Sequence, residues 1–202
     1  MSEISAIAVK ELRDISGAGM MDCKKALSEA SGDLDKAMDI LRKSGIAKAQ
    51  KKSGRSTKEG MIYSYIHPGS KLGVLVEINC ETDFVANTED FINLNKDLAM
   101  HIAASTPISI KREDISSNIL EREKEIYADQ ARQSGKPDNI IDKMIEGRIN
   151  KFYQDNVLLE QAFVKDPDKN VQDVITDTIA KLGENIVVAR FARFQLGEQI
   201  NS

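Results

Sequence analysis

The side chains with which proteins usually do chemistry are few in this chain, and their spacing argues against catalysis. Its two cysteines and two histidines are Cys23, Cys80, His67 and His101, and no pair of them stands at the spacing of metal ligands. The glycine-rich patterns that bind nucleotide phosphates are absent. Cys23 and His101 fall on apolar helix stripes, where core packing explains them better than a reactive role. The sequence therefore predicts no catalytic residue, no metal and no cofactor. It favours a binding protein over an enzyme whose site carries no motif.

Three segments carry residues suited to contact with a partner, and the first is the loop from Gly17 to Gly19. Lys10, Arg13, Met20 and Met21 gather around this loop. Two adjacent methionines cannot both point into one helix stripe, so at least one should be exposed, where its flexible side chain suits a protein contact. The alternative is that these residues close the base of a small helical bundle.

The second segment follows a predicted strand and reads Thr82, Asp83, Phe84, Val85 and Ala86. Thr82 can cap a helix, which would place Asp83 and Phe84 on its first turn, where side chains are easily presented to a partner. If that helix is continuous, however, Phe84 lies on nearly the same face as Phe91. Periodicity alone therefore predicts that Phe84 belongs to the core.

The third segment is the run from Arg42 to Lys58, which holds seven positive charges and no negative one. RNA binding is the sharper interpretation of this run. It lacks the interleaved aromatic residues on which bases stack, so a solvated linker is favoured.

Composition and charge bound the class of protein. The 202 residues are 41% hydrophobic and 30% charged, which is typical of a soluble globular protein. No apolar run approaches the roughly 18 residues that span a bilayer, so we expect no membrane segment and no signal peptide. Two distant cysteines suit a reducing cytoplasm. Residues 1–58 hold twelve Lys and Arg against eight Asp and Glu, whereas the other 144 hold sixteen against twenty-four. A basic head thus precedes an acidic body.

Hydrophobic spacing predicts three short helices within residues 1–45. Their apolar stripes are Ile4, Ile7, Ala8, Leu12 and Ile15; Cys23, Ala26, Leu27 and Ala30; and Leu34, Ala37, Met38 and Leu41. Asp33 is a good N-cap for the third helix, and Gly45 is a good C-terminal stop. We expect a three-helix, partner-docking domain over 1–45, similar in size to ubiquitin-associated (UBA) domains, and then a basic linker over 46–58.

Residues 59–202 predict an α+β core domain with an antiparallel sheet, packed helices and a helical hairpin. The expected elements are a β-hairpin over 61–79 with its turn at 68–71, a helix through 91–102, two helices over 117–154 broken at 135–137, a strand over 157–164, a helix over 171–182 and a last strand over 186–194.

Taken together, these segments resemble the bacterial elongation factor Ts family, the guanine-nucleotide exchange factors of elongation factor Tu. The resemblance runs along essentially the whole chain. It is carried by residues 9–13, 16–27, 81–86, 100–104, 133–137, 145–148, 159–161, 163–167 and 193–194. Residues 16–27 (SGAGMMDCKKAL) and 81–86 (ETDFVA) match the two signature motifs of the family.

The resemblance implies that the head docks beside the nucleotide site of elongation factor Tu, with Lys10, Arg13, Met20 and Met21 at contact positions. It also implies that Thr82, Asp83, Phe84 and Val85 form a wedge, and that Asp83 and Phe84 intrude beside the partner's magnesium instead of lying in the core. Such a factor would bind no nucleotide itself and would act without bond chemistry.

Longer family members carry a duplicated core, for which this chain has no room. Short members are similar to this chain and work as homodimers, so we expect a two-fold dimer. Candidate interface elements are the helical hairpin over 117–154 and the last strand.

Two other functions remain open at this point. A head of this size could act alone as a UBA-like binding module. A ribosomal accessory protein could instead use the basic linker to bind RNA through Lys48, Lys51, Lys52 and Arg55, although the acidic body makes this the weaker hypothesis.

Overall fold

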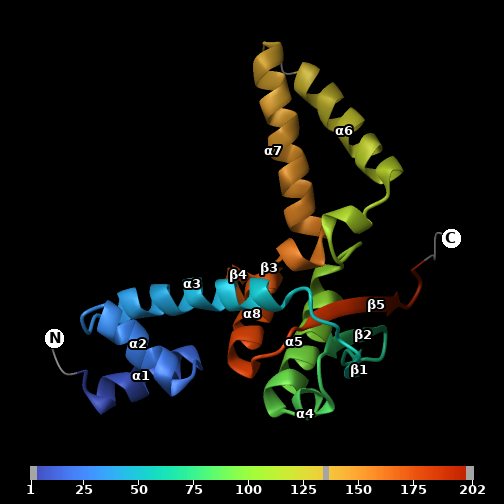
Figure 1. Ribbon diagram of the computed structural model, residues 1–202. Helices are drawn as coiled ribbons and strands as arrows, with labels where there is room; N and C mark the ends of the chain where they lie inside the picture. Colours follow the sequence, from blue (N-terminus) through green and yellow to red (C-terminus); the bar gives the residue numbers. More distant parts are fainter. Residues whose placement is uncertain (1–3, 134–136, 199–202) are drawn as a thin grey trace. The chain divides into compact units, whose positions relative to one another are not determined.

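The computed structural model describes residues 4–133 and 137–198 (Figure 1). It contains both α-helices and β-strands, as the sequence predicts. The helices are α1 (Ala6–Ser16), α2 (Met20–Glu29), α3 (Leu34–Lys52), α4 (Asp83–Ala86), α5 (Glu89–Ser105), α6 (Ser117–Arg132), α7 (Asp138–Asn156) and α8 (Val171–Leu182). The strands are β1 (Glu59–Ile66), β2 (Leu72–Cys80), β3 (Ala162–Phe163), β4 (Asp166–Asn170) and β5 (Val187–Gln195). Two 3-10 turns lie at Arg112–Asp114 and Leu158–Glu160. The predicted α+β class is confirmed.

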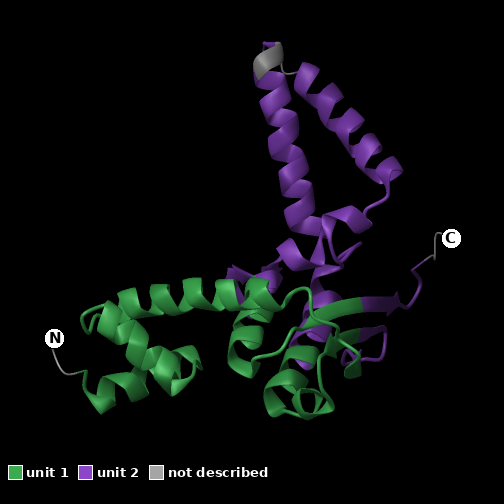
Figure 2. Ribbon diagram, viewed as in Figure 1, with its two compact units in different colours: residues 1–62, 77–95, 173–189 green, residues 63–76, 96–172, 190–202 purple. Residues whose placement is uncertain are grey.

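The chain forms two compact units and passes between them several times (Figure 2). The first unit comprises residues 1–62, 77–95 and 173–189, and the second comprises 63–76, 96–172 and 190–202. Both predicted partner-binding segments, the loop near Gly17 and the turn at Thr82, belong to the first unit. The predicted division of the chain at residues 45 and 58 stays a prediction.

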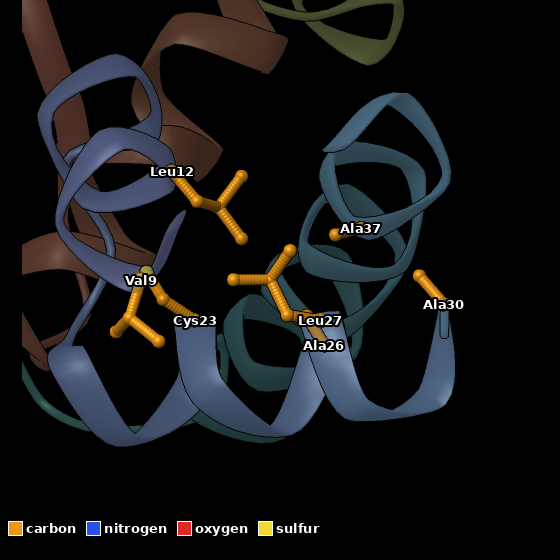
Figure 3. Packing of buried hydrophobic residues seen from close by; sticks show 7 residues of the cluster. All are labelled: Val9, Leu12, Cys23, Ala26, Leu27, Ala30 and Ala37. Carbon is orange, nitrogen blue, oxygen red and sulfur yellow. The ribbon is translucent and has the colours of Figure 1, made fainter. Parts of the chain in front are cut away.

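The predicted three-helix head is present, and its helices close around small and aliphatic side chains. Figure 3 shows this cluster, which consists of Val9, Leu12, Cys23, Ala26, Leu27, Ala30 and Ala37. Asp33 caps α3 as expected, since its carboxylate accepts a hydrogen bond from the backbone N–H of Lys36 at 3.0 Å. One part of the predicted stripe is wrong: Ile7 and Ile15 are exposed, because α1 turns Val9 and Leu12 toward its neighbours instead.

Gly45 does not end the third helix. Helix α3 continues through Gly45 to Lys52, so residues 46–52 of the predicted linker are helical. The reason is packing: a β-carbon at Gly45 would stand only 3.3 Å from that of Ala180 on α8. This glycine therefore allows two helices of the first unit to approach closely.

The main sheet has the strand order β1-β2-β5. Strands β1 and β2 form the predicted hairpin, in which the backbone N–H of His67 donates to the carbonyl oxygen of Leu72 at 2.9 Å. Along β2 the side chains of Val74, Val76 and Ile78 are buried and that of Leu75 is exposed, as the alternation predicts.

The predicted strand over 157–164 is wrong. Val157 caps the end of α7, and a 3-10 turn follows, so only Ala162 and Phe163 are extended; they pair antiparallel with β4. The physical reason is Gln161, which is buried, and whose side-chain amide donates to the carbonyl oxygens of Ser105 (3.1 Å) and Asp155 (2.8 Å). These contacts hold the chain in a turn where apolar alternation suggested a strand.

The helical hairpin is confirmed as α6 and α7, which contact each other along the second unit. Of its predicted break, Gly135 and Lys136 lie outside the described residues, and Pro137 stands at the N-terminus of α7. None of the helices among the described residues combines the length and the apolar character that crossing a membrane requires.

His101 is a buried core residue, as its place on the α5 stripe predicts. Its Nδ1 accepts a hydrogen bond from the backbone N–H of Val164 at 3.3 Å, so Nε2 carries the proton and donates to Gln161 Oε1 at 3.0 Å. Burial lowers the pKa of His101 from its ordinary value, against a smaller opposing effect of Gln161. The folded protein therefore keeps this imidazole neutral.

This environment predicts a loss of stability in acid. Because the pKa of His101 is lowered by folding, the unfolded chain takes up a proton near pH 6.5 that the folded chain does not, so the free energy of unfolding falls below that pH. Urea unfolding at pH 7.5 and 5.5 should show a smaller pH-dependent loss in His101→Gln than in the wild type, whereas His67→Gln, at an exposed position, should keep the wild-type loss. Equal losses in wild type and His101→Gln would contradict this account.

Candidate partner-binding site

The Thr82 turn leaves strand β2 as a single turn of helix. Thr82 has extended backbone angles (φ −131°, ψ 156°), and its hydroxyl oxygen accepts a hydrogen bond from the backbone N–H of Val85 at 3.4 Å. Helix α4 then ends after Ala86, where the N–H of Asn87 donates to the carbonyl oxygen of Asp83 at 3.1 Å. Thr82 is thus the N-cap that the sequence predicts.

Phe84 points out of this turn and is 82% exposed. Periodicity placed Phe84 in the core, and this prediction is wrong because the helix is not continuous: Thr88 starts a new helix by accepting from the N–H of Phe91 at 3.3 Å. Val85 and Phe91 are buried and anchor the turn in the core, while the aromatic ring of Phe84 stays in solvent. Asp83 is also exposed. The exposure implied by the resemblance is therefore present; partner binding by these residues stays a prediction.

A carboxylate from a distant part of the sequence accepts hydrogen bonds from the start of the turn. Glu184, two residues after α8, accepts hydrogen bonds from the backbone N–H groups of Glu81 (3.1 Å) and Thr82 (3.0 Å) and from the Thr82 hydroxyl (2.7 Å). Sequence reasoning missed Glu184, since it stands in no motif and lies about a hundred residues from its partners. Nothing in its local pattern distinguishes it from the other surface carboxylates.

The carboxylate of Glu81 makes the reverse contact, from the turn to the segment that contains Glu184. Glu81 accepts a hydrogen bond from the backbone N–H of Asn185 at 2.7 Å and an ion-pair contact from Arg55 at 3.4 Å. The Asn185 hydrogen bond first, and the Arg55 charge after it, lower the pKa of Glu81 from its usual range. Glu81 therefore stays ionised under mildly acidic conditions.

Cys80 lies beside this network as a core residue. Its thiol donates to the carbonyl oxygen of Thr82 at 3.2 Å. Burial, followed by the charge of Glu184, raises the pKa of the Cys80 thiol to about 11. The group is therefore a neutral thiol at physiological pH, with only a small fraction of the nucleophilic thiolate.

The head residues singled out by sequence lie on its surface. Lys10 and Arg13 are exposed on α1, and Met20 and Met21 are 54% and 76% exposed at the start of α2. The prediction that at least one methionine is exposed is confirmed, and the alternative that they close the bundle is wrong. Gly17 (φ +66°) makes the left-handed turn that ends α1, with its N–H bonded to the Arg13 carbonyl oxygen at 2.8 Å.

The loop at Gly17 and the turn at Thr82 both contact one short segment, residues 181–185. The Lys181 side chain lies against Gly17, with its Cδ 3.6 Å from where a β-carbon of Gly17 would be, and its ammonium bonds Asp90 at 2.6 Å. Glu184, three residues on, holds the turn. The structure thus brings the two predicted partner-binding segments to one anchor within the first unit.

Several side chains of the basic run over 42–58 form ion pairs or hydrogen bonds within the first unit. Lys48 pairs with Asp22 at 2.7 Å, Arg42 with Asp173 at 3.6 Å, Lys52 with the carbonyl oxygen of Gly183 and Arg55 with Glu81. These contacts favour the structural interpretation of the run over RNA binding. Within residues 4–133 and 137–198, no group of three or more His, Cys, Asp or Glu side chains could hold a metal ion.

Comparison with protein families identifies the chain. The family model described as elongation factor TS matches residues 8–198, which include the head loop and the Thr82 turn. The chain belongs to the elongation factor Ts family. It is therefore related to translation elongation factors.

Individual members of the elongation factor Ts family align along almost the whole chain. Elongation factor Ts of Geotalea daltonii is 61% identical over 195 residues, covering 96% of this chain and 90% of that protein. The factor of Thermoanaerobacter sp. is 58% identical over 199 residues, 98% of each chain. That of Fervidobacterium nodosum is 58% identical over 196 residues, 97% of this chain and 100% of the relative. Members of this length are thus a regular part of the family.

Proposed function

We propose that this chain is a guanine-nucleotide exchange factor that binds elongation factor Tu in its GDP form and promotes GDP release, so that GTP can rebind during translation elongation in the cytoplasm. The observation that supports it best is Phe84, a ring 82% exposed on a turn whose base is fixed by Glu184. An apolar ring held rigidly in solvent is costly in the free protein and suited to a pocket of a partner.

The mechanism requires no bond chemistry, so the chain is not an enzyme in this proposal. Magnesium bridges a bound nucleotide's phosphates to its protein, and Phe84 and Asp83, inserted beside it, would disturb a large electrostatic contribution to GDP binding. Exchange factor and nucleotide then weaken each other's binding by the same factor. A thousandfold faster release corresponds to a barrier lower by roughly 4 kcal/mol, which a few buried anchors can supply.

The head supplies the second contact of this proposal. Met20, Met21, Ile7 and Ile15 are exposed apolar side chains, and Lys10 and Arg13 are exposed cations on the same helix as Ile7 and Ile15. Such a mixture of flexible apolar and basic groups suits an acidic, partly apolar protein surface. The head would give affinity, while the Thr82 turn would act on the nucleotide site.

The exchange function predicts a specific pattern of losses. Release of a fluorescent GDP from elongation factor Tu should accelerate with substoichiometric wild-type chain, and Phe84→Ala should slow the catalysed release at least tenfold because the anchor is lost. Asp83→Ala should also reduce it. Ile108→Ala removes an exposed apolar side chain from the second unit and should leave the rate unchanged. No acceleration by the wild type would refute the function, and equal acceleration by all variants would refute the assignment of the turn.

We further propose that two copies of the chain associate through the last strand. In the second unit, Ile66, Leu72, Leu75, Phe194 and Leu196 line a groove of about 480 Å³. Ile66, Leu75, Phe194 and Leu196 are exposed large apolar residues, which a soluble chain usually covers. A second copy placing the same face against this groove would bury them symmetrically.

Sedimentation equilibrium tests the dimer. The wild type should sediment as a dimer, and the double variant Phe194→Asp, Leu196→Asp should sediment as a monomer because two charges would be buried in the interface. Ile119→Asp with Ile126→Asp, on the exposed face of α6, serves as the matched variant and should remain dimeric. A monomeric wild type, or dissociation by the α6 variant alone, would contradict this interface.

A further inference from the structure

We propose that Glu184 is a positioning residue for the exchange reaction, acting through the presentation of Phe84; this inference rests on the proposed function. Helix α4 has four residues, and a single helical turn has no stability of its own in water. Its outward side chain, Phe84, adds almost nothing to hold it in place. The orientation of the ring must therefore come from the base of the turn.

Glu184 accepts three hydrogen bonds at that base. Its carboxylate accepts from the Thr82 hydroxyl at 2.7 Å and from the N–H groups of Thr82 and Glu81 at 3.0 and 3.1 Å. Hydrogen bonds to an ionised acceptor are about twice as strong as neutral ones. The Thr82 hydroxyl connects Glu184 to the helical turn, because its oxygen also accepts a hydrogen bond from the N–H of Val85, the residue after Phe84.

Glu184 is itself fixed on both sides. Gly183 before it adopts a left-handed conformation (φ +80°) and closes α8 by donating its N–H to the Ile179 carbonyl oxygen at 2.9 Å. Asn185 after it is buried and donates its side-chain amide to the Arg55 carbonyl oxygen at 2.9 Å. The backbone that carries the Glu184 carboxylate is thus held on both sides.

The two carboxylates exchange backbone partners and so lock two segments together. Glu184 accepts from the N–H groups at 81 and 82, and Glu81 accepts from the N–H at 185. When a partner protein presses against the Phe84 ring, this reciprocal clamp resists rotation of the turn. Without it, part of the binding free energy would be spent on ordering the turn and less would act on the partner's nucleotide site.

Glu184→Gln tests the proposal, because it keeps the shape of the side chain but removes its charge. The head surface is untouched, so we expect the maximal rate of fluorescent GDP release at saturating chain to fall about tenfold. The concentration giving half of that rate should change less than about threefold. Glu160→Gln is the matched control: that carboxylate also accepts two hydrogen bonds, from Arg112, and belongs to the second unit. Its kinetics should equal those of the wild type.

A double-mutant cycle separates positioning from general structural damage. If Glu184 acts through Phe84, adding Glu184→Gln to Phe84→Ala should cause no further loss of rate. Full additivity of the two losses, or an unchanged rate in Glu184→Gln alone, would overturn the proposal.

A second variant covers the case in which Glu184→Gln does not fold. Gly183→Ala keeps the Glu184 carboxylate but strains the left-handed residue that precedes it. The added methyl group would have room, since its nearest neighbour is the Lys52 ammonium at 3.6 Å. The Gly183→Ala variant should show the same selective loss of the maximal rate of GDP release. Wild-type kinetics in this variant would overturn the proposal. If the wild type itself releases no GDP, the proposed function fails, and this inference falls with it.

Discussion

The first unit depends on hydrogen bonds between two carboxylates and the backbone of the opposite segment. Glu184 holds the start of the Thr82 turn, and Glu81 holds the start of the segment that leads into β5. Because three of their donors are backbone N–H groups, the clamp depends little on the identity of the side chains around it. Removing one partner would leave the others without their hydrogen bonds, which costs more than an average surface contact contributes.

The first unit keeps apolar side chains in water. Leaving a residue such as Phe84 or Met21 exposed forgoes roughly 1.5–3 kcal/mol of burial each. The same groups recover that free energy when a partner covers them, which is why a binding protein tolerates them on rigid elements. Rigidity matters here because an ordered ring loses little conformational freedom on binding.

Periodicity and capping predicted most of the elements correctly, because those signals are local. The caps at Asp33 and Thr82 and the alternation along β2 all appear as expected. The failures share a different cause, which is tertiary contact. Gly45 continues a helix because Ala180 lies against it, and the apolar run after Val157 turns because the buried Gln161 side chain binds two carbonyl oxygens. Ala180 and Ser105 lie far along the chain from Gly45 and Gln161, so local spacing cannot indicate these contacts.

Phe84 shows the same limit at the candidate site. Its spacing from Phe91 suggested one continuous stripe, whereas the break at Asn87 and Thr88 turns the ring outward. Resemblance to a family predicted the exposure, since a family motif records selection that hydrophobic spacing does not. Glu184 had neither a motif nor a pattern, and only the three-dimensional contact identifies it.

In the proposed function, Phe84 enters the partner at a place where its presence and that of nucleotide exclude each other. The most direct test replaces Phe84 with a photo-crosslinking phenylalanine derivative and measures its attachment to elongation factor Tu as GDP is added. Efficient crosslinking is expected without nucleotide, with a progressive loss of crosslinks as the concentrations of GDP and magnesium rise. No crosslink from position 84, or a yield that GDP leaves unchanged, would contradict it.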